Sequence, residues 1–273
     1  MRARPNIISV ILLAICLVIF SRGPLSAQGS FQLTPAARFL LGMEGNYMWV
    51  LGNMLIPSGG RPGSGSRVGF SELGLEPTEG FSAFLRASIL EDHLFSFDYL
   101  AFSPSGERRI TRTFRFHNKT YEKGSLVESR LDFNWLRFSY GYQVVNVPGW
   151  TVAPKIGVHH VRNAITLNGE TKEAELFTNT RRLDGTYPVL GVETRLLFPL
   201  GLHLSLEMEG IHLITRGFLT FFQLGAIWEV IPDMAFTLAV SNRTMHFLEN
   251  NQPLNNEWFC SAFAVTSGVG FTF

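Results

Sequence analysis

Reactive side chains spaced two residues apart are the first candidates for chemistry in this chain of 273 residues. His203, Ser205 and Glu207 would share one face of a β-strand, because side chains alternate across a strand. A hydroxyl, an imidazole and a carboxylate in contact can form an activated nucleophile. Polar side chains that only hydrogen-bond to one another would give the same pattern.

Metal and phosphate chemistry have less support. His159 and His160 are adjacent, so a strand would point them to opposite faces and they would not bind one ion together. Residues 59–65 are rich in glycine but lack the Lys-Ser/Thr pair of a phosphate-binding loop. The chain has two cysteines, Cys16 and Cys260. If the N-terminal segment that contains Cys16 is removed, as argued below, no internal disulfide can form. The sequence predicts no catalytic residue, no cofactor and no metal.

Charged side chains alternate with apolar ones in several segments. Opposite charges on neighbouring strands can pair, and a buried charge without a partner is costly. We therefore expect a network of paired charges in the interior of the fold. Its predicted members are Arg86, Asp98, Arg130, Asp132, Glu193, Arg195, Glu207 and Glu209. Lys155, Glu229 and Arg243 fall on the same polar face of their segments.

The phase of residues 126–143 decides where two of these charges point. Arg130 and Asp132 lie on one face of this segment, and aromatic side chains lie on the other. Two adjacent apolar residues, Trp135 and Leu136, interrupt the alternation, which predicts a β-bulge. The charged face is expected to be the interior one.

A second group of charges is basic and lies close together in the chain. Guanidinium groups bind phosphates and carboxylates with two parallel hydrogen bonds. We expect this stretch to contact anionic glycolipid or another surface polyanion, with Phe114 and Phe116 at the headgroup boundary. A solvated charged loop is the alternative. The predicted anion contacts are Arg108, Arg109, Arg112, Arg115 and Lys119.

The elements that would position these residues are strands, as the last stretch of the chain illustrates. Between 259 and 273, large apolar residues occupy one face and small or mildly polar residues occupy the other. Nothing follows that would cover the apolar face. The stretch resembles the closing strand of a bacterial outer-membrane β-barrel, and Phe271 with the final Phe273 resembles the signal that the barrel assembly machinery reads.

The rest of the chain repeats this pattern in about ten strands. Short turns near 91–92, 147–149, 199–201 and 231–233 alternate with longer loops, which we expect outside the cell, near 50–79, 103–124, 167–186, 215–217 and 248–258. This alternation is typical of an up-and-down antiparallel transmembrane β-barrel. A soluble β-sandwich or lipocalin-like barrel has a similar strand pattern.

The N-terminus supports the membrane interpretation. Arg2 and Arg4 precede an apolar run from 7 to 20 and small residues up to Ala27, which predicts a cleaved signal peptide over 1–27 and a barrel over 28–273. A retained membrane anchor is the alternative. Removal of 1–27 takes three arginines from 23 basic residues, against 22 acidic ones, so no nucleic-acid partner is implied.

Several stretches resemble a family of uncharacterised bacterial outer-membrane barrel proteins over about residues 67–198. They are Phe-Ser-Glu-Leu-Gly-Leu-Glu at 70–76, His-Leu-Phe-Ser-Phe-Asp-Tyr at 93–99, Arg-Ile-Thr-Arg at 109–112, Tyr-Glu-Lys-Gly at 121–124 and Tyr-Pro-Val-Leu-Gly at 187–191. The resemblance implies a topology and no reaction.

Two enzyme families with similar barrels have motifs that can be sought in this sequence. Omptin proteases use Asp-x-Asp opposite Asp-x-His, and none of the aspartates near the strands belongs to either motif. His203 and Ser205 resemble the His-x-Ser of lipid A deacylase barrels, whose site faces the outer leaflet. His203 directly follows the turn at 199–201, on the periplasmic side, so polar lumen residues are the favoured interpretation.

The sequence therefore predicts an integral outer-membrane barrel with a structural or surface-interaction role and a lumen plugged by charges. Its expected partners are outer-membrane lipids, lipopolysaccharide and the assembly machinery. A narrow polar channel for small solutes is the first alternative. An outer-leaflet lipid-modifying enzyme is the second.

Overall fold

The computed structural model describes residues 37–56, 65–90, 92–116, 119–170, 176–213, 217–231, 233–251 and 254–273. The predicted signal peptide over 1–27 lies outside these residues. No helix in the described part of the chain is long and apolar enough to cross a membrane.

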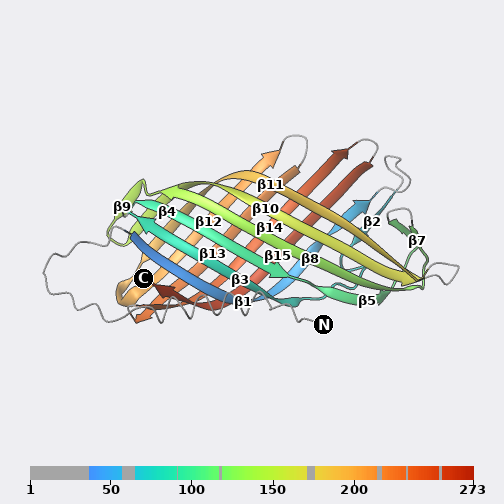
Figure 1. Ribbon diagram of the computed structural model, residues 1–273, viewed down its shortest axis with the longest axis horizontal. Coiled ribbons are helices and arrows are strands. Elements are labelled where there is room, and N and C mark those ends of the chain that lie inside the picture. The colour runs from blue at the N-terminus through green and yellow to red at the C-terminus, as the bar shows by residue number, and fades with distance from the viewer. Residues whose placement is uncertain are drawn as a thin grey trace, which may run out of the picture. The chain divides into compact units, whose positions relative to one another are not determined.

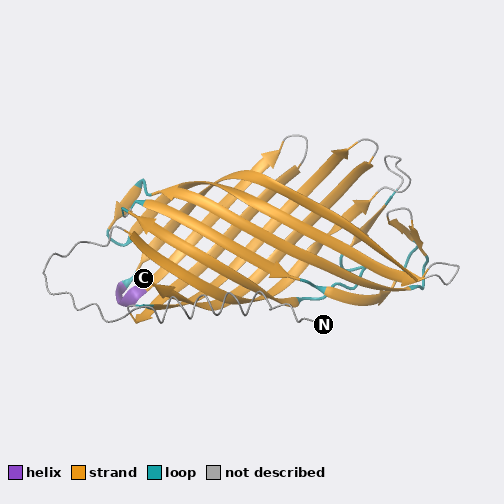
Figure 2. Ribbon diagram, viewed as in Figure 1, coloured by secondary structure: helices purple, strands orange, loops and turns teal. Residues whose placement is uncertain are grey.

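Ten long strands in the described residues close into an antiparallel barrel (Figures 1 and 2). Each pairs with its neighbours in chain order, β1 pairs with β15, and β8 pairs with both β4 and β10. The expected all-β, up-and-down antiparallel fold is therefore confirmed. The strands are β1 (Ala37–Ile56), β3 (Thr78–Ile89), β4 (His93–Phe102), β8 (Leu126–Tyr142), β10 (Trp150–Glu170), β11 (Leu176–Leu197), β12 (Leu202–Leu213), β13 (Gly217–Ile231), β14 (Met234–Asn251) and β15 (Leu254–Thr272).

The two ends of the barrel differ in their connections. One end, here called the short-turn end, carries β9 (Val145–Val147) and the 3₁₀ turn η1 (Pro199–Gly201). The opposite end, called the long-loop end, carries short strands (Figure 1). These are β2 (Ser66–Gly69), β5 (Ser105–Arg109), β6 (Phe114–Phe116) and β7 (Lys119–Tyr121).

Two of the expected long loops are mostly strand. Backbone pairing of β10 with β11 continues from the barrel wall to Glu170 and Leu176, so most of 167–186 belongs to a hairpin. Likewise β14 and β15 pair as far as Asn251 and Leu254, within the region expected to be a loop at 248–258. Polar composition suggested loops there, but a strand that extends beyond the lipid is also polar on its outer face.

Apolar side chains cover the middle of the outer wall. Phe138, Ile156 and Leu190 are exposed on three neighbouring strands, in the manner of a lipid-facing band. On β15, Phe263 and Phe271 point outward while Ala262 and Ala264 are fully buried. The two faces predicted for the closing strand are thus the ones observed.

The predicted bulge at Trp135 and Leu136 is wrong. The register of β8 against β10 runs without interruption from Val127 to Gly141. Trp135 is consequently buried and Leu136 points outward. The alternation rule failed here because the interior near the long-loop end is itself apolar, so the aromatic face of β8 is the inner face.

An apolar cluster fills this part of the interior, and the β6–β7 hairpin contributes to it. Phe114, Phe116 and Tyr121 from the hairpin are at most 2% exposed and belong to the same cluster as Phe133 and Trp258 from the wall. The expected position of Phe114 and Phe116 at the lipid headgroups is therefore wrong. The hairpin covers the barrel interior with its aromatic face and points Arg115 to solvent. We call the hairpin, together with the apolar cluster that it covers, the cap.

Candidate functional site: a charged layer across the lumen

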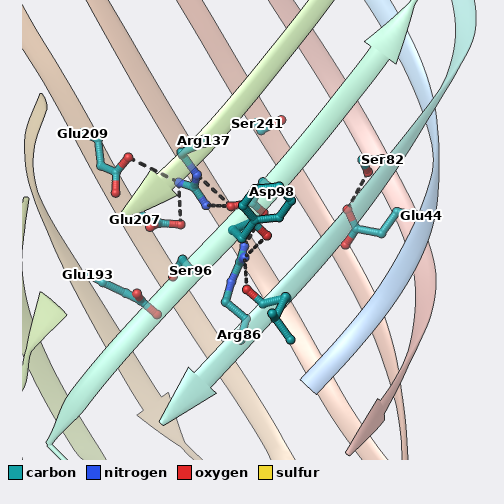
Figure 3. A network of polar contacts seen from close by, with 12 residues as sticks. Glu44, Ser82, Arg86, Ser96, Asp98, Arg137, Glu193, Glu207, Glu209 and Ser241 are labelled. Carbon is teal, nitrogen blue, oxygen red and sulfur yellow. Dashed lines mark hydrogen bonds and ion pairs between the residues drawn. The ribbon is translucent and has the colours of Figure 1, made fainter. Parts of the chain in front are cut away.

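A layer of buried charges crosses the lumen on the short-turn side of the cap. Figure 3 shows part of this layer around Arg137 and Asp98. Its side chains come from six consecutive wall strands, β3, β4, β8, β10, β11 and β12. Alternation places them inward, since each occupies the position two residues from another inward-facing side chain. The layer contains Arg86, Asp98, Arg137, Lys155, His159, Glu193, Arg195, Glu207 and Glu209.

Arg137 lies at the centre of the layer. Its Nη2 is 2.6 Å from Oδ2 of Asp98, and its Nη1 is 2.9 Å from Oε2 of Glu207. Asp98 also pairs through Oδ1 with Arg86 at 2.6 Å, so one carboxylate joins two guanidinium groups. The Arg137 side chain is only 2% exposed. A charge buried to this degree requires such partners, because desolvation alone would be strongly unfavourable.

Lys155 forms the second centre. Its Nζ lies 3.1 Å from Oε2 of Glu193 and donates a hydrogen bond to Oγ of Ser96 at 3.2 Å. It also pairs with Glu207, which thereby links Lys155 to Arg137. The Lys155 side chain is fully buried. Three strands are cross-linked through this one ammonium group and its carboxylates.

His159 extends the network toward the cap. Its Nε2 is 2.6 Å from Oε2 of Glu209, and its ring lies 5.5 Å from that of Trp135. Because His159 and Glu209 are both fully buried, the pair joins the charged layer to the apolar one. His160 points to the opposite side of the wall and hydrogen-bonds to Thr186, as expected for the next residue of a strand.

Phe221 provides the layer with an aromatic platform. The guanidinium carbon of Arg137 is 4.1 Å from its ring centre, and that of Arg243 is 5.1 Å away. Cations favour the face of an aromatic ring, and more so when they are shielded from water. Arg243 also donates a hydrogen bond to Oγ of Ser241 at 2.8 Å.

Six of the eight sequence-predicted network residues belong to this layer, and two do not. Arg130 and Asp132 pair with each other at 2.8 Å on the outer face of β8, with side chains 62% and 38% exposed. They point outward because β8 has no bulge. Sequence reasoning missed Arg137 and His159 as members. The alternation of Arg137 with the apolar Phe138 was the signal that would have found Arg137.

A cavity of about 140 Å³ lies beside the charged layer, lined also by side chains near the short-turn end. Ser205 and His203 line it, but Glu207 is paired with Arg137 and Lys155. His203 instead lies 3.7 Å from Glu229. These three residues therefore do not make the contacts of an activated nucleophile. No group of three or more metal-ligating side chains suited to an ion occurs in the described ranges.

Most of the basic stretch contacts protein. Arg108 donates to the backbone carbonyl of Ser71, and Arg109 donates to that of Gly124 at 3.2 Å. Arg112 forms an ion pair with Glu72 at 2.8 Å. Three of the five predicted anion contacts thus fasten the loops of the long-loop end to one another. Arg115 and Lys119 are exposed on the hairpin.

The hairpin that carries these two residues is fixed by contacts within itself and to the wall. The ring of Phe114 in β6 stacks on that of Tyr121 in β7 at 4.9 Å, and Asn179 of β11 donates a hydrogen bond to the carbonyl of Phe116 at 3.2 Å. Burial raises the pKa of the Tyr121 hydroxyl. The cap is consequently a packed part of the fold.

Comparison with solved structures agrees with this architecture. The outer-membrane protease OmpT from Escherichia coli superposes with a TM-score of 0.59 and 10% identity, covering 90% of this chain and 100% of that one. Outer membrane protein AlkL gives 0.37 with 11% identity, covering 92% and 95%. Ail of Yersinia pestis, in complex with the heparin analogue sucrose octasulfate, gives 0.33 with 7% identity, covering 86% and 99%.

The likeness to OmpT is one of fold alone, and the two lower scores carry no argument. No protein-family model and no curated protein matches the sequence. The closed ten-stranded barrel and its lipid-facing band define a bacterial outer-membrane β-barrel protein. Its fold resembles that of OmpT, a barrel enzyme, and its own chemistry depends on the residues described above.

Proposed function

We propose that this protein is a non-conducting barrel of the outer membrane, with a structural or surface-interaction role and the long-loop end facing outward. The observation that carries the proposal is the charged layer, in which Arg137 of β8 reaches across the lumen to Glu207 of β12, three strands away along the wall. Pairs between neighbouring strands, such as Arg86 with Asp98 and Lys155 with Glu193, extend the layer on either side. The apolar cap adds a second layer between the charges and the long-loop end. Water and ions crossing the barrel would have to displace both.

Planar-bilayer recordings of the purified protein test this role. We expect no resolvable unitary currents from the parent protein, because displacing a fully buried ion pair costs several kcal/mol. Resolvable currents at moderate salt would instead favour the first alternative, a narrow polar channel for small solutes. Incubation with lipopolysaccharide followed by mass spectrometry addresses the second alternative, and a trimmed lipid product would establish an outer-leaflet lipid enzyme.

The orientation has its own test. Lys123 and Asn146 are both exposed and lie at opposite ends of the barrel, and Cys260 is buried. With Lys123→Cys, a membrane-impermeant maleimide should label intact cells. With Asn146→Cys, the matched control, labelling should require permeabilised cells. The reverse pattern would contradict an outward long-loop end.

We further propose that the outward end contacts anionic glycolipid. Arg108, Arg109, Arg112, Arg115 and Lys119 are all exposed, and Arg115 and Lys119 lie on the hairpin at the long-loop end. Arginine and lysine near an anionic surface contribute attraction that weakens as salt is added. The proposal does not assign a catalytic role to the barrel.

A further inference from the structure

The outer wall carries a group of basic side chains just beyond the apolar band toward the long-loop end. On β8, β10 and β11 the outward residues Arg130, Arg162 and Arg182 are exposed. Arg162 lies opposite Asn134 on one side and Asp184 on the other, and the next outward position of β11 is Arg182. Diagonal neighbours of this kind lie about 7 Å apart. We call Arg130, Arg162 and Arg182 the wall arginines.

Two of the three wall arginines have their guanidinium groups available. Arg130 is paired with Asp132, whose other contact is a hydrogen bond from Ser103 at 2.8 Å. Arg162 and Arg182 make no hydrogen bond or ion pair with the other described residues. Asp184, the carboxylate opposite Arg162, lies 3.6 Å from His160. Arg162 and Arg182 therefore differ from Arg108, Arg109 and Arg112 of the loops, whose side chains contact protein.

A depression of about 270 Å³ lies next to Arg162 on this wall. Tyr99, Asn134, Leu136 and His160 complete its lining, and the Tyr99 hydroxyl donates a hydrogen bond to Oδ1 of Asn134 at 3.0 Å. The depression is thus polar toward the long-loop end and apolar at Leu136.

The depression marks the edge of the lipid-facing band. Two residues further along the same strands toward the short-turn end, the next outward side chains are Phe138, 46% exposed, and Val158, 42% exposed. A ligand bound here would have anionic groups beside the arginines and hydrocarbon along the band. A phosphorylated glycolipid of the outer leaflet has this arrangement.

We propose that the wall arginines and the adjoining depression form a binding site for the phosphorylated headgroup of lipopolysaccharide. The proposal deepens the glycolipid contact of the proposed function and rests on its outward long-loop end. It moves the main contact from the loop arginines to the wall. Guanidinium groups bind phosphate oxygens with paired hydrogen bonds, and the depression would accept the headgroup at the point where its acyl chains begin.

The test compares two matched double variants of the full-length barrel, refolded in detergent and exposed to lipopolysaccharide. Arg162→Gln/Arg182→Gln removes two exposed guanidinium groups from the wall, and Arg109→Gln/Arg115→Gln removes two from the loop. We expect the wall variant to retain about tenfold less lipopolysaccharide at low salt, and the loop variant, which loses only the weaker contact, to retain about twofold less. Heat-modifiable migration verifies that each variant is folded.

Equal retention by the wall variant and the parent would overturn the site, as would a loss confined to the loop variant. Dephosphorylated lipopolysaccharide should be retained as poorly by the parent as the intact lipid is by the wall variant. Millimolar inorganic phosphate should not displace the lipid, and displacement would mean a site for free anions. Cysteine labelling reports the orientation independently, so a wrong site and a wrong orientation give different results.

Discussion

Arg137 binds the charged layer together through contacts that no single neighbour could replace. Beyond Asp98 and Glu207, its Nη1 lies 3.6 Å from Oε2 of Glu209. Removing it would leave Glu207, Glu209 and Glu193 with Lys155 as the shared buried cation. Such a change would lower the free energy of unfolding, because the carboxylates would lack sufficient positive charge in a region shielded from water.

We predict that Arg137→Met lowers the free energy of unfolding by about 3–5 kcal/mol. Adding Glu207→Gln to this variant should restore part of the loss, because it removes one of the excess negative charges. Urea titrations of the detergent-solubilised barrel, followed by tryptophan fluorescence, measure both changes. Strictly additive losses would mean that these charges are individually solvated.

Arg130→Gln provides the control at the same strand. Its ion pair with Asp132 is exposed to solvent, so its removal should change the free energy of unfolding by about 0–1 kcal/mol. A loss comparable to that of Arg137→Met would contradict the assignment of Arg130 to the outer wall. The two arginines are seven positions apart on β8 and face opposite ways.

The residue types of the network could be predicted from the sequence, but the partners could not. Glu207 and Glu209 alternate with outward apolar residues, and that pattern is sufficient to point them inward. Arg130 and Asp132 show the same alternation with Leu131 and Phe133, yet point outward. Periodicity gives two faces without saying which is inside, and β8 passes from an apolar interior to a charged one along its length.

Among the elements, the β6–β7 hairpin is short but well anchored. Its aromatic side chains pack into the barrel interior, while the backbone N–H of Arg115 donates to Oγ of Ser66 at 3.1 Å and joins the hairpin to β2. A three-residue strand pair is not stable by itself in water. The hairpin is therefore ordered by the surface that it covers.

We predict that Phe114→Ala/Phe116→Ala releases the hairpin while the barrel remains folded. Replacing a buried phenylalanine with alanine costs about 3–5 kcal/mol of stability. A hairpin this short would not stay packed on the barrel after losing two such contributions. Limited proteolysis should then cut near 110–124, with heat-modifiable migration unchanged. Arg115→Ala, the exposed position between the two, is the control and should resist cleavage as the parent does. Equal resistance of the double variant would show that other contacts hold the cap.

The elements also show where sequence reasoning succeeded. The closing strand could be identified because its two faces differ. Its inner face carries small residues, since space in the lumen beside β1 is limited. A Cβ at Gly42 of β1 would lie 2.2 Å from the ring of Phe84, so glycine permits that ring to fill the interior. Loop lengths were less predictable, because β10, β11, β14 and β15 remain paired well past the apolar band.

At the scale of the whole barrel, the side chains that fill the lumen change from apolar to charged along the barrel axis. Aromatic and aliphatic side chains fill the half near the long-loop end, and paired charges cross the next layer. Toward the short-turn end the lumen is hollow, with a cavity lined by Glu44, Arg243 and other polar residues. The closed half is therefore the half whose outer wall carries the proposed lipid site.

Closure of the barrel depends on the seam between β1 and β15, and Phe273 lies at its end. Its backbone N–H and C=O exchange hydrogen bonds of 3.0 Å with Phe39, and the two rings stack at 5.7 Å. Both Phe271 and Phe273 point outward, 40% and 45% exposed. The two rings therefore lie on the outer face of the closing strand, which is where the expected assembly signal requires them.

We predict that Phe273→Leu impairs assembly in cells without weakening the folded barrel. The fraction of heat-modifiable protein in the outer membrane should fall and a periplasmic pool should appear, because we expect the assembly machinery to recognise the terminal aromatic ring. Phe236→Leu is the matched control, since Phe236 is also an outward, 45% exposed aromatic residue near the short-turn end. Both variants should refold in detergent as readily as the parent, which separates recognition from stability. Equal assembly of the two variants in cells would mean that the terminal ring acts only through the seam.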